Sequence, residues 1–122
     1  GVHAIIGMLY RPDRIVRPAS WARPILFGDL WSDDPCDEDY NMMVRAPYKN
    51  SHECLHRSDP LYDLILLTGW NWPCAVKDRG SAVFLHQWRR PGMATEGCIG
   101  LRRQDLQHIA SIIQMRTRLI IM

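Results

Sequence analysis

The chain has 122 residues, of which 47% are apolar and 23% charged, and its formal net charge is +2. This length and composition are typical of one ordinary globular domain. The charge is too small to indicate nucleic-acid binding, and no apolar run approaches the ~18 residues of a membrane span. We therefore expect residues 1–122 to form a single domain that neither binds nucleic acid nor crosses a membrane.

The first half of the chain predicts one strand followed by a long irregular segment. Val2–Tyr10 is apolar and contains several β-branched residues, which favours a strand. From Arg11 to Pro60, six prolines interrupt the sequence. Because proline lacks a backbone donor and fixes φ, this spacing predicts loops, with no long helix and no central strand. The acidic stretch Trp31–Asn41 lacks the regular ligand spacing of a calcium loop, and we interpret it as a solvated loop.

The second half of the chain predicts most of the regular structure. Leu61–Thr68 is almost continuously apolar, which predicts a strand buried on both faces. The runs Ser81–His86, Cys98–Leu101 and Thr117–Met122 predict three more strands. Gln104–Met115 is the one predicted helix, with a buried stripe at Leu106, Ile109, Ala110 and Ile113. The predicted fold is mainly β: a β-rich α+β domain with mixed or sandwiched sheets, long loops and one C-terminal helix.

The cysteines do not indicate a structural metal site. The chain has four cysteines: Cys36, Cys54, Cys74 and Cys98. No two of them form a CxxC pair, so the spacing of a metal knuckle is absent. If Cys98 is a free thiol, at most one disulfide remains, and the sequence is equally compatible with none.

A histidine and a cysteine lie at the ends of two neighbouring predicted strands. His86 ends one strand and Cys98 begins the next. If the two strands pair antiparallel, both side chains lie at one edge of the sheet, where an imidazole can convert a thiol to the nucleophilic thiolate. Gly97 leaves room for backbone N–H groups to face a reacting carbonyl. On spacing alone, a buried cysteine and an ordinary strand-end histidine explain the pattern equally well.

The same segment resembles the active-site signature of the L,D-transpeptidase catalytic domain, the YkuD family. That signature is a histidine, a variable stretch, and then Ser/Thr-His-Gly-Cys; here these places are held by His86, Gln87–Ala94 and Thr95-Glu96-Gly97-Cys98. The resemblance extends over the whole chain. It is carried further by the segments Leu9–Arg14, Tyr40–Tyr48, Leu61–Thr68, Arg79–His86 and Thr95–Leu101, which are similar to a branch of small bacterial YkuD-like proteins.

The resemblance implies a role for each residue of the signature. Cys98 would be the nucleophile and His86 its base, while the N–H groups of Gly97 and Cys98 would hold the oxyanion and the carbonyl of Gln87 would orient the imidazole. The substrates would be peptidoglycan stem peptides in the periplasm or cell envelope, and carbapenem β-lactams would be inhibitors. No metal or organic cofactor is required. Substrate carboxylates would meet the loop over the site, at Trp88, Arg89 and Arg90. Substrate preference would also depend on Glu96, the residue before Gly97.

This sequence departs from the family pattern at two places, which leaves an alternative open. Glu96 stands where the family has a second histidine, and Gly100 stands where an arginine is usual, so that Arg102 or Arg103 takes its place or nothing does. The alternative is a catalytically silent cell-wall-binding domain of the same fold. The family domain usually starts earlier, so we expect this sequence to lack N-terminal strands. Its first residues do not have the pattern of a signal peptide.

A second motif points to different chemistry. His52-Glu53-Cys54-Leu55-His56 matches the zinc-peptidase pattern HExxH, which requires both histidines on one face of a helix. Pro47 and Pro60 limit any helix here to about two turns. We interpret the segment as a short exposed helix capped by Ser51, and zinc catalysis as the less favoured alternative.

Overall fold

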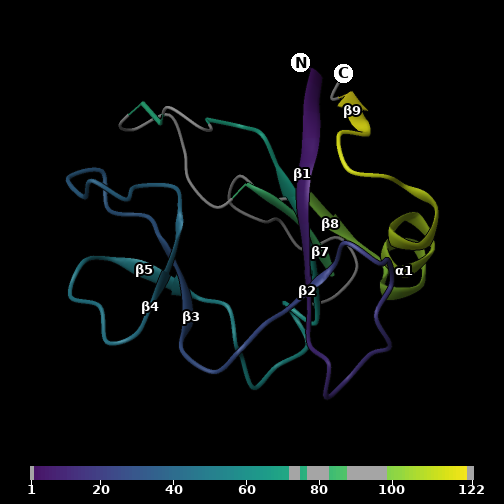
Figure 1. The fold of residues 1–122 in the computed structure, drawn as a ribbon, viewed down its shortest axis with the longest axis horizontal. Helices are drawn as coiled ribbons and strands as arrows, with labels where there is room; N and C mark the ends of the chain where they lie inside the picture. The colour runs from purple at the N-terminus through teal and green to yellow at the C-terminus, as the bar shows by residue number, and fades with distance from the viewer. Residues whose placement is uncertain (1, 72–74, 77–82, 88–98, 121–122) are drawn as a thin grey trace.

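The computed structural model describes residues 2–71, 75–76, 83–87 and 99–120. Its main sheet has six strands in the order β2-β1-β6-β7-β8, with β9 also pairing with β1 (Figure 1). The strands are β1 (Val2–Tyr10), β2 (Arg23–Pro24), β6 (Leu64–Thr68), β7 (Phe84–Gln87), β8 (Ile99–Leu101) and β9 (Arg118–Ile120). Antiparallel pairing joins β1 to β6 and to β9, and β6 to β7, whereas β1–β2 and β7–β8 are parallel.

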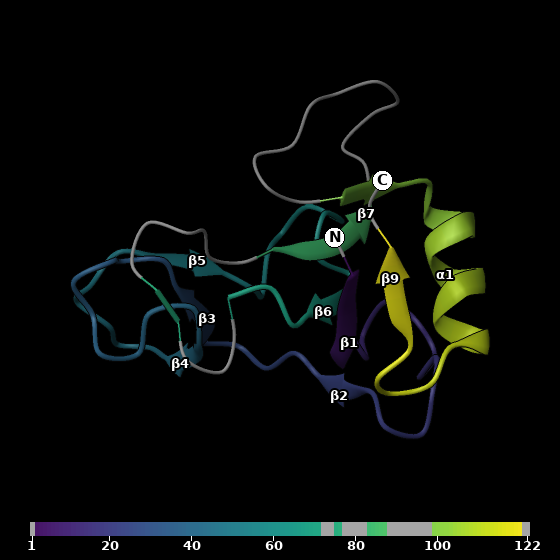
Figure 2. The same ribbon diagram turned by 90° about the horizontal axis from the view of Figure 1, so that it is seen from above.

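Helix α1 (Arg103–Ile112) covers one face of this sheet (Figure 2). Its fully buried side chains are Leu106 and Ala110, and Ile109 and Ile113 pack against the same core. The predicted apolar stripe is therefore confirmed, although the helix ends earlier than predicted. No helix in the part of the chain that the structure describes is long and apolar enough to span a membrane.

The opposite side of the main sheet faces a second, antiparallel sheet in the order β4-β3-β5 (Figure 1). Its strands are β3 (Asp29–Ser32), β4 (Met43–Arg45) and β5 (His52–Cys54). The core between the sheets combines aliphatic and aromatic side chains; it consists of Leu9, Ile25, Trp31, Leu55, Leu61, Tyr62, Ile65 and Phe84. In β6, Ile65 belongs to this core and Leu66 to the helix-side core, so the prediction of a strand buried on both faces is confirmed.

The prediction of no central strand in the proline-rich half is wrong. Strand β3 is the middle strand of the second sheet and is fully buried. The stretch between Pro24 and Pro35 contains no proline, so every residue of β3 keeps its backbone donor. The rest of the segment contains the short strands β2, β4 and β5 where loops were predicted, and it has no long helix, as predicted. The mainly β fold with one helix is confirmed.

The acidic stretch is organised by a carboxylate that accepts hydrogen bonds. Asp37 Oδ2 accepts from the hydroxyl of Ser32 at 2.6 Å and from the hydroxyl of Tyr48. These bonds stabilise the ionised form, and they lower the pKa of Asp37 from 3.8 to about 2, with the Ser32 bond as the largest cause. The stretch is therefore an ordered turn held to the end of β3.

We expect Asp37→Asn to remove an acid-sensitive part of the stability. The unfolded chain binds more protons than the folded chain between pH ~4 and ~2, so the contribution of Asp37 is complete above that window and is lost as the pH falls through it. Urea unfolding of both proteins at several pH values should show the difference in their free energies of unfolding shrinking below pH ~4. A difference that stays constant down to pH 2 would contradict this assignment.

Candidate functional site

The imidazole of His86 is buried and held at one nitrogen. His86 lies near the end of β7, is only 3% exposed, and has Nδ1 2.7 Å from the carbonyl oxygen of Gln87. A carbonyl oxygen can only accept, so Nδ1 carries the proton, and Nε2 is the ring nitrogen with the lone pair. The expected hydrogen bond to Gln87 is thus present, and it presents Nε2 as a proton acceptor.

The prediction that the two strands of the signature pair antiparallel is wrong. Strands β7 and β8 are parallel, with Leu85 opposite Ile99 and His86 opposite Gly100. The connection between them, residues 88–98, is eleven residues long. A parallel pair needs a connection of about that length to return the chain to the same end of the sheet, whereas a hairpin needs only a few residues.

Several predicted site residues lie outside the described residues. They are the nucleophile candidate, its neighbours and the loop residues: Cys98, Gly97, Glu96, Trp88, Arg89 and Arg90. The structure does describe His86 and Gln87 at the start of the signature and Gly100 just after it. Because Cys98 is bonded to Ile99, it directly precedes the strand that pairs with β7.

The face of β7 that carries His86 is walled by aromatic rings. Phe84 and His86 lie two residues apart on the strand and so share one face. The ring of Tyr62 lies edge-on to both, with centroid distances of 6.0 Å to Phe84 and 5.6 Å to His86. Tyr62 lies in the predicted strand Leu61–Thr68, two residues before the observed start of β6, and its place beside His86 was not predicted.

On the opposite face of β7, Gln87 leads to a cluster of ion pairs around the buried carboxylate of Asp63. Its Oε1 accepts from Arg103 Nη1 at 3.1 Å, and the same nitrogen donates to Asp63 Oδ2 at 2.9 Å. The other oxygen of Asp63 accepts from Arg14 at 2.8 Å, and Asp63 is only 4% exposed. The cluster fixes the end of β7 against the start of α1.

The arginine that the family places two residues after the nucleophile has no direct replacement at that register. Gly100 lies opposite His86. Arg102 pairs with Asp105 on the surface of the helix, at 2.9 Å. Arg103 instead joins the cluster with Asp63 and Gln87 on the helix side of the sheet.

The prediction of a helix at the HExxH motif is wrong, and its zinc geometry is absent. His52–Cys54 forms strand β5, because it pairs with β3, and this tertiary partner overrides the local preference. His52 and His56 therefore do not lie one helical turn apart. Glu53 instead accepts a hydrogen bond from the hydroxyl of Tyr62, at 2.7 Å.

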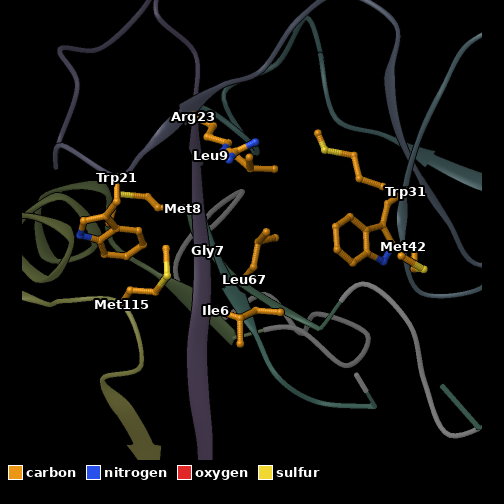
Figure 3. A pocket seen from close by; sticks show the side chains of 11 residues that line it. Ile6, Gly7, Met8, Leu9, Trp21, Arg23, Trp31, Met42, Leu67 and Met115 are labelled. Carbon is orange, nitrogen blue, oxygen red and sulfur yellow. The ribbon is translucent and has the colours of Figure 1, made fainter. Parts of the chain in front are cut away.

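An apolar recess of about 390 Å³ flanks β1 and is separate from His86 (Figure 3). Trp21 and Met115 lie on one side of the strand, and Trp31 and Leu67 lie on the other. Of the predicted site residues that the structure describes, neither His86 nor Gln87 lines this recess. His86 and the recess are thus two different features of the molecule.

Two packed sheets and one helix, with a buried histidine near the end of β7, define a β-rich domain. The model of the L,D-transpeptidase catalytic domain, YkuD, matches residues 1–121, and the chain belongs to this family. Members of the family are typically L,D-transpeptidases that act on peptidoglycan peptides and are associated with the cell envelope. Searches among curated proteins and among solved structures returned no match.

Proposed function

We propose that this domain catalyses cysteine-dependent acyl transfer on peptidoglycan stem peptides, with Cys98 as nucleophile and His86 as base. The observation that carries the proposal is the buried imidazole of His86, with Nδ1 on the carbonyl of Gln87. This contact leaves Nε2 as the proton acceptor. Membership of the YkuD family supplies the class of reaction.

Chain connectivity supports the pairing of the two catalytic residues. Gly100 lies opposite His86, and Cys98 comes two residues before Gly100, directly before the first residue of the β7–β8 ladder. Because consecutive Cα atoms lie 3.8 Å apart, Cys98 is held within one residue of that ladder. The proposal requires the Cys98 sulfur to come within about 4 Å of Nε2 of His86 during reaction.

The proposed reaction has two balanced steps. In the first, the thiol proton of Cys98 moves to Nε2 of His86 and the sulfur attacks the carbonyl carbon of an L-centre residue in the donor peptide. The N–H groups of Gly97 and Cys98 stabilise the oxyanion, and the terminal D-alanine leaves with the proton from His86. In the second, an acceptor amine attacks the thioester, His86 takes its proton, and the proton returns to the departing sulfur of Cys98.

The acceptor decides which of two related activities results. An amine of a second stem peptide gives a cross-link, whereas water makes the protein an L,D-carboxypeptidase. We propose that Arg89 and Arg90, with Trp88, contact substrate carboxylates, and that Glu96 influences which donor is accepted. The site of action would be the periplasm or cell envelope.

Acylation by a carbapenem tests the proposal directly. We expect incubation with a carbapenem to increase the intact mass by one acyl adduct, because the thiolate of Cys98 opens the β-lactam ring. The Cys98→Ala variant should gain no mass, and the other cysteines serve as internal controls. Intact-mass spectrometry of both proteins gives the result.

The alternatives predict different outcomes of the same measurement. A folded wild-type protein that gains no adduct would contradict acyl transfer and favour a catalytically silent wall-binding domain, in which Glu96 and Gly100 have replaced functional residues. An adduct that persists in Cys98→Ala would show that a different cysteine reacts. The zinc-peptidase alternative has no support from β5, because the motif is not helical.

A further inference from the structure

A chain of contacts connects His86 to the second sheet. The first link is the ring of Tyr62, whose centroid lies 5.6 Å from that of the imidazole, with an interplanar angle of 77°. The second is the hydrogen bond from the hydroxyl of Tyr62 to Glu53 Oε2 on β5, at 2.7 Å. Strand β5 of the second sheet and strand β7 of the main sheet are thus connected through one tyrosine, Tyr62.

Tyr62 is itself held from several directions. It is 5% exposed, and the ring of Phe84 lies 6.0 Å away. The guanidinium carbon of Arg57 lies 5.6 Å from the ring centroid, within the range of a cation–π contact. Arg57 is in turn paired with Asp59 at 2.6 Å. A ring fixed at its edge, its face and its hydroxyl has little freedom to rotate.

One hydrogen bond alone does not fix the orientation of an imidazole. The bond from Nδ1 to the carbonyl of Gln87 holds one ring atom of His86. The edge-on ring of Tyr62, at an aromatic-pair distance, packs against the imidazole and limits its tilt about that bond. We propose that Tyr62 is a positioning residue for His86 and that Glu53 holds Tyr62 in place. The expected effect on the acylation rate rests on the proposed function, whereas the orientation of the His86 ring does not.

The test combines a kinetic and a spectroscopic readout. Tyr62→Leu removes the ring and should slow acylation of Cys98 by a carbapenem on the order of ten- to a hundredfold, because small misplacements of reacting groups have effects of this size. In ¹H–¹⁵N spectra, the wild-type His86 should be the Nδ1-protonated tautomer, with its signals assigned by their absence in His86→Gln. In Tyr62→Leu we expect a mixture with the Nε2-protonated tautomer.

Trp31→Leu is the matched control. Trp31 belongs to the same core, is similarly buried, and contacts Phe84 edge-on at 5.0 Å. We expect its His86 tautomer to match that of the wild type and its acylation rate to change less than that of Tyr62→Leu. If Trp31→Leu and Tyr62→Leu slow the reaction equally and neither changes the tautomer, Tyr62 is only a core residue and the proposal is wrong.

Tyr62→Phe keeps the test decisive if Tyr62→Leu does not fold. It retains the ring and removes only the hydrogen bond to Glu53, so we expect a smaller slowing and a detectable second tautomer. Wild-type rate and wild-type tautomer in Tyr62→Phe would overturn the role of Glu53. If the wild-type protein is not acylated at all, the proposed function fails, but the tautomer spectra still decide whether Tyr62 positions His86.

Discussion

Replacing His86 by glutamine is expected to slow the acylation of Cys98 by a carbapenem about 10²- to 10⁴-fold at neutral pH. Glutamine is neutral and can still hydrogen-bond, but it cannot accept the thiol proton. The measurement is the rate of adduct formation by intact mass at fixed carbapenem concentration. His108→Gln is the control, because His108 is an exposed residue of α1.

The pH dependence separates a base from a structural residue. A free thiol ionises with a pKa near 8.5, so above about pH 9 Cys98 needs no base to become a thiolate. We therefore expect the rate of His86→Gln to approach that of the wild type as the pH rises from 7 to 9.5. If the ratio of the two rates stays constant across this range, His86 supports the site in some way other than by accepting the thiol proton.

Local patterns predicted the buried elements well. The apolar stripe of α1 and the two-faced burial of β6 follow from periodicity within single segments, and both are confirmed. The direction of the β7–β8 pair was not predictable in this way, because strand direction depends on the path of the connection rather than on the strands. The same holds for β5, whose strand conformation depends on pairing with β3.

The site shows the same division between local and long-range signals. His86 was predicted because its place before a Thr-x-Gly-Cys sequence is a short-range pattern. Tyr62 and Glu53 come together only through the packing of two sheets, and a single sequence contains no signal for that contact. The HExxH match singled out Glu53 as part of a zinc motif, which the strand conformation of β5 excludes. Glu53 is nevertheless connected to His86 through Tyr62.

Phe84→Ala is expected to have the largest effect on stability, lowering the free energy of unfolding by about 3–5 kcal/mol. Phe84 is 1% exposed and lies between the two sheets, with its ring edge-on to Trp31 at 5.0 Å and to Tyr62 at 6.0 Å. Truncation removes these contacts and leaves a cavity, since the surrounding strands belong to two different sheets and cannot both close on it.

Phe27→Ala provides the control for this loss, because Phe27 is 84% exposed and should change stability by only about 0.5 kcal/mol or less. Urea unfolding of the wild type and both variants gives the comparison, with unchanged slopes indicating that only stability has changed. If Phe84→Ala unfolds at the same urea concentration as Phe27→Ala, the two sheets do not pack through Phe84.

The same substitution is expected to affect His86, which lies two residues further along β7. Because the ring of Phe84 packs against that of Tyr62, its loss would loosen Tyr62, and Tyr62 in turn contacts His86. Phe84→Ala should therefore show the mixed His86 tautomer even under conditions in which it remains folded.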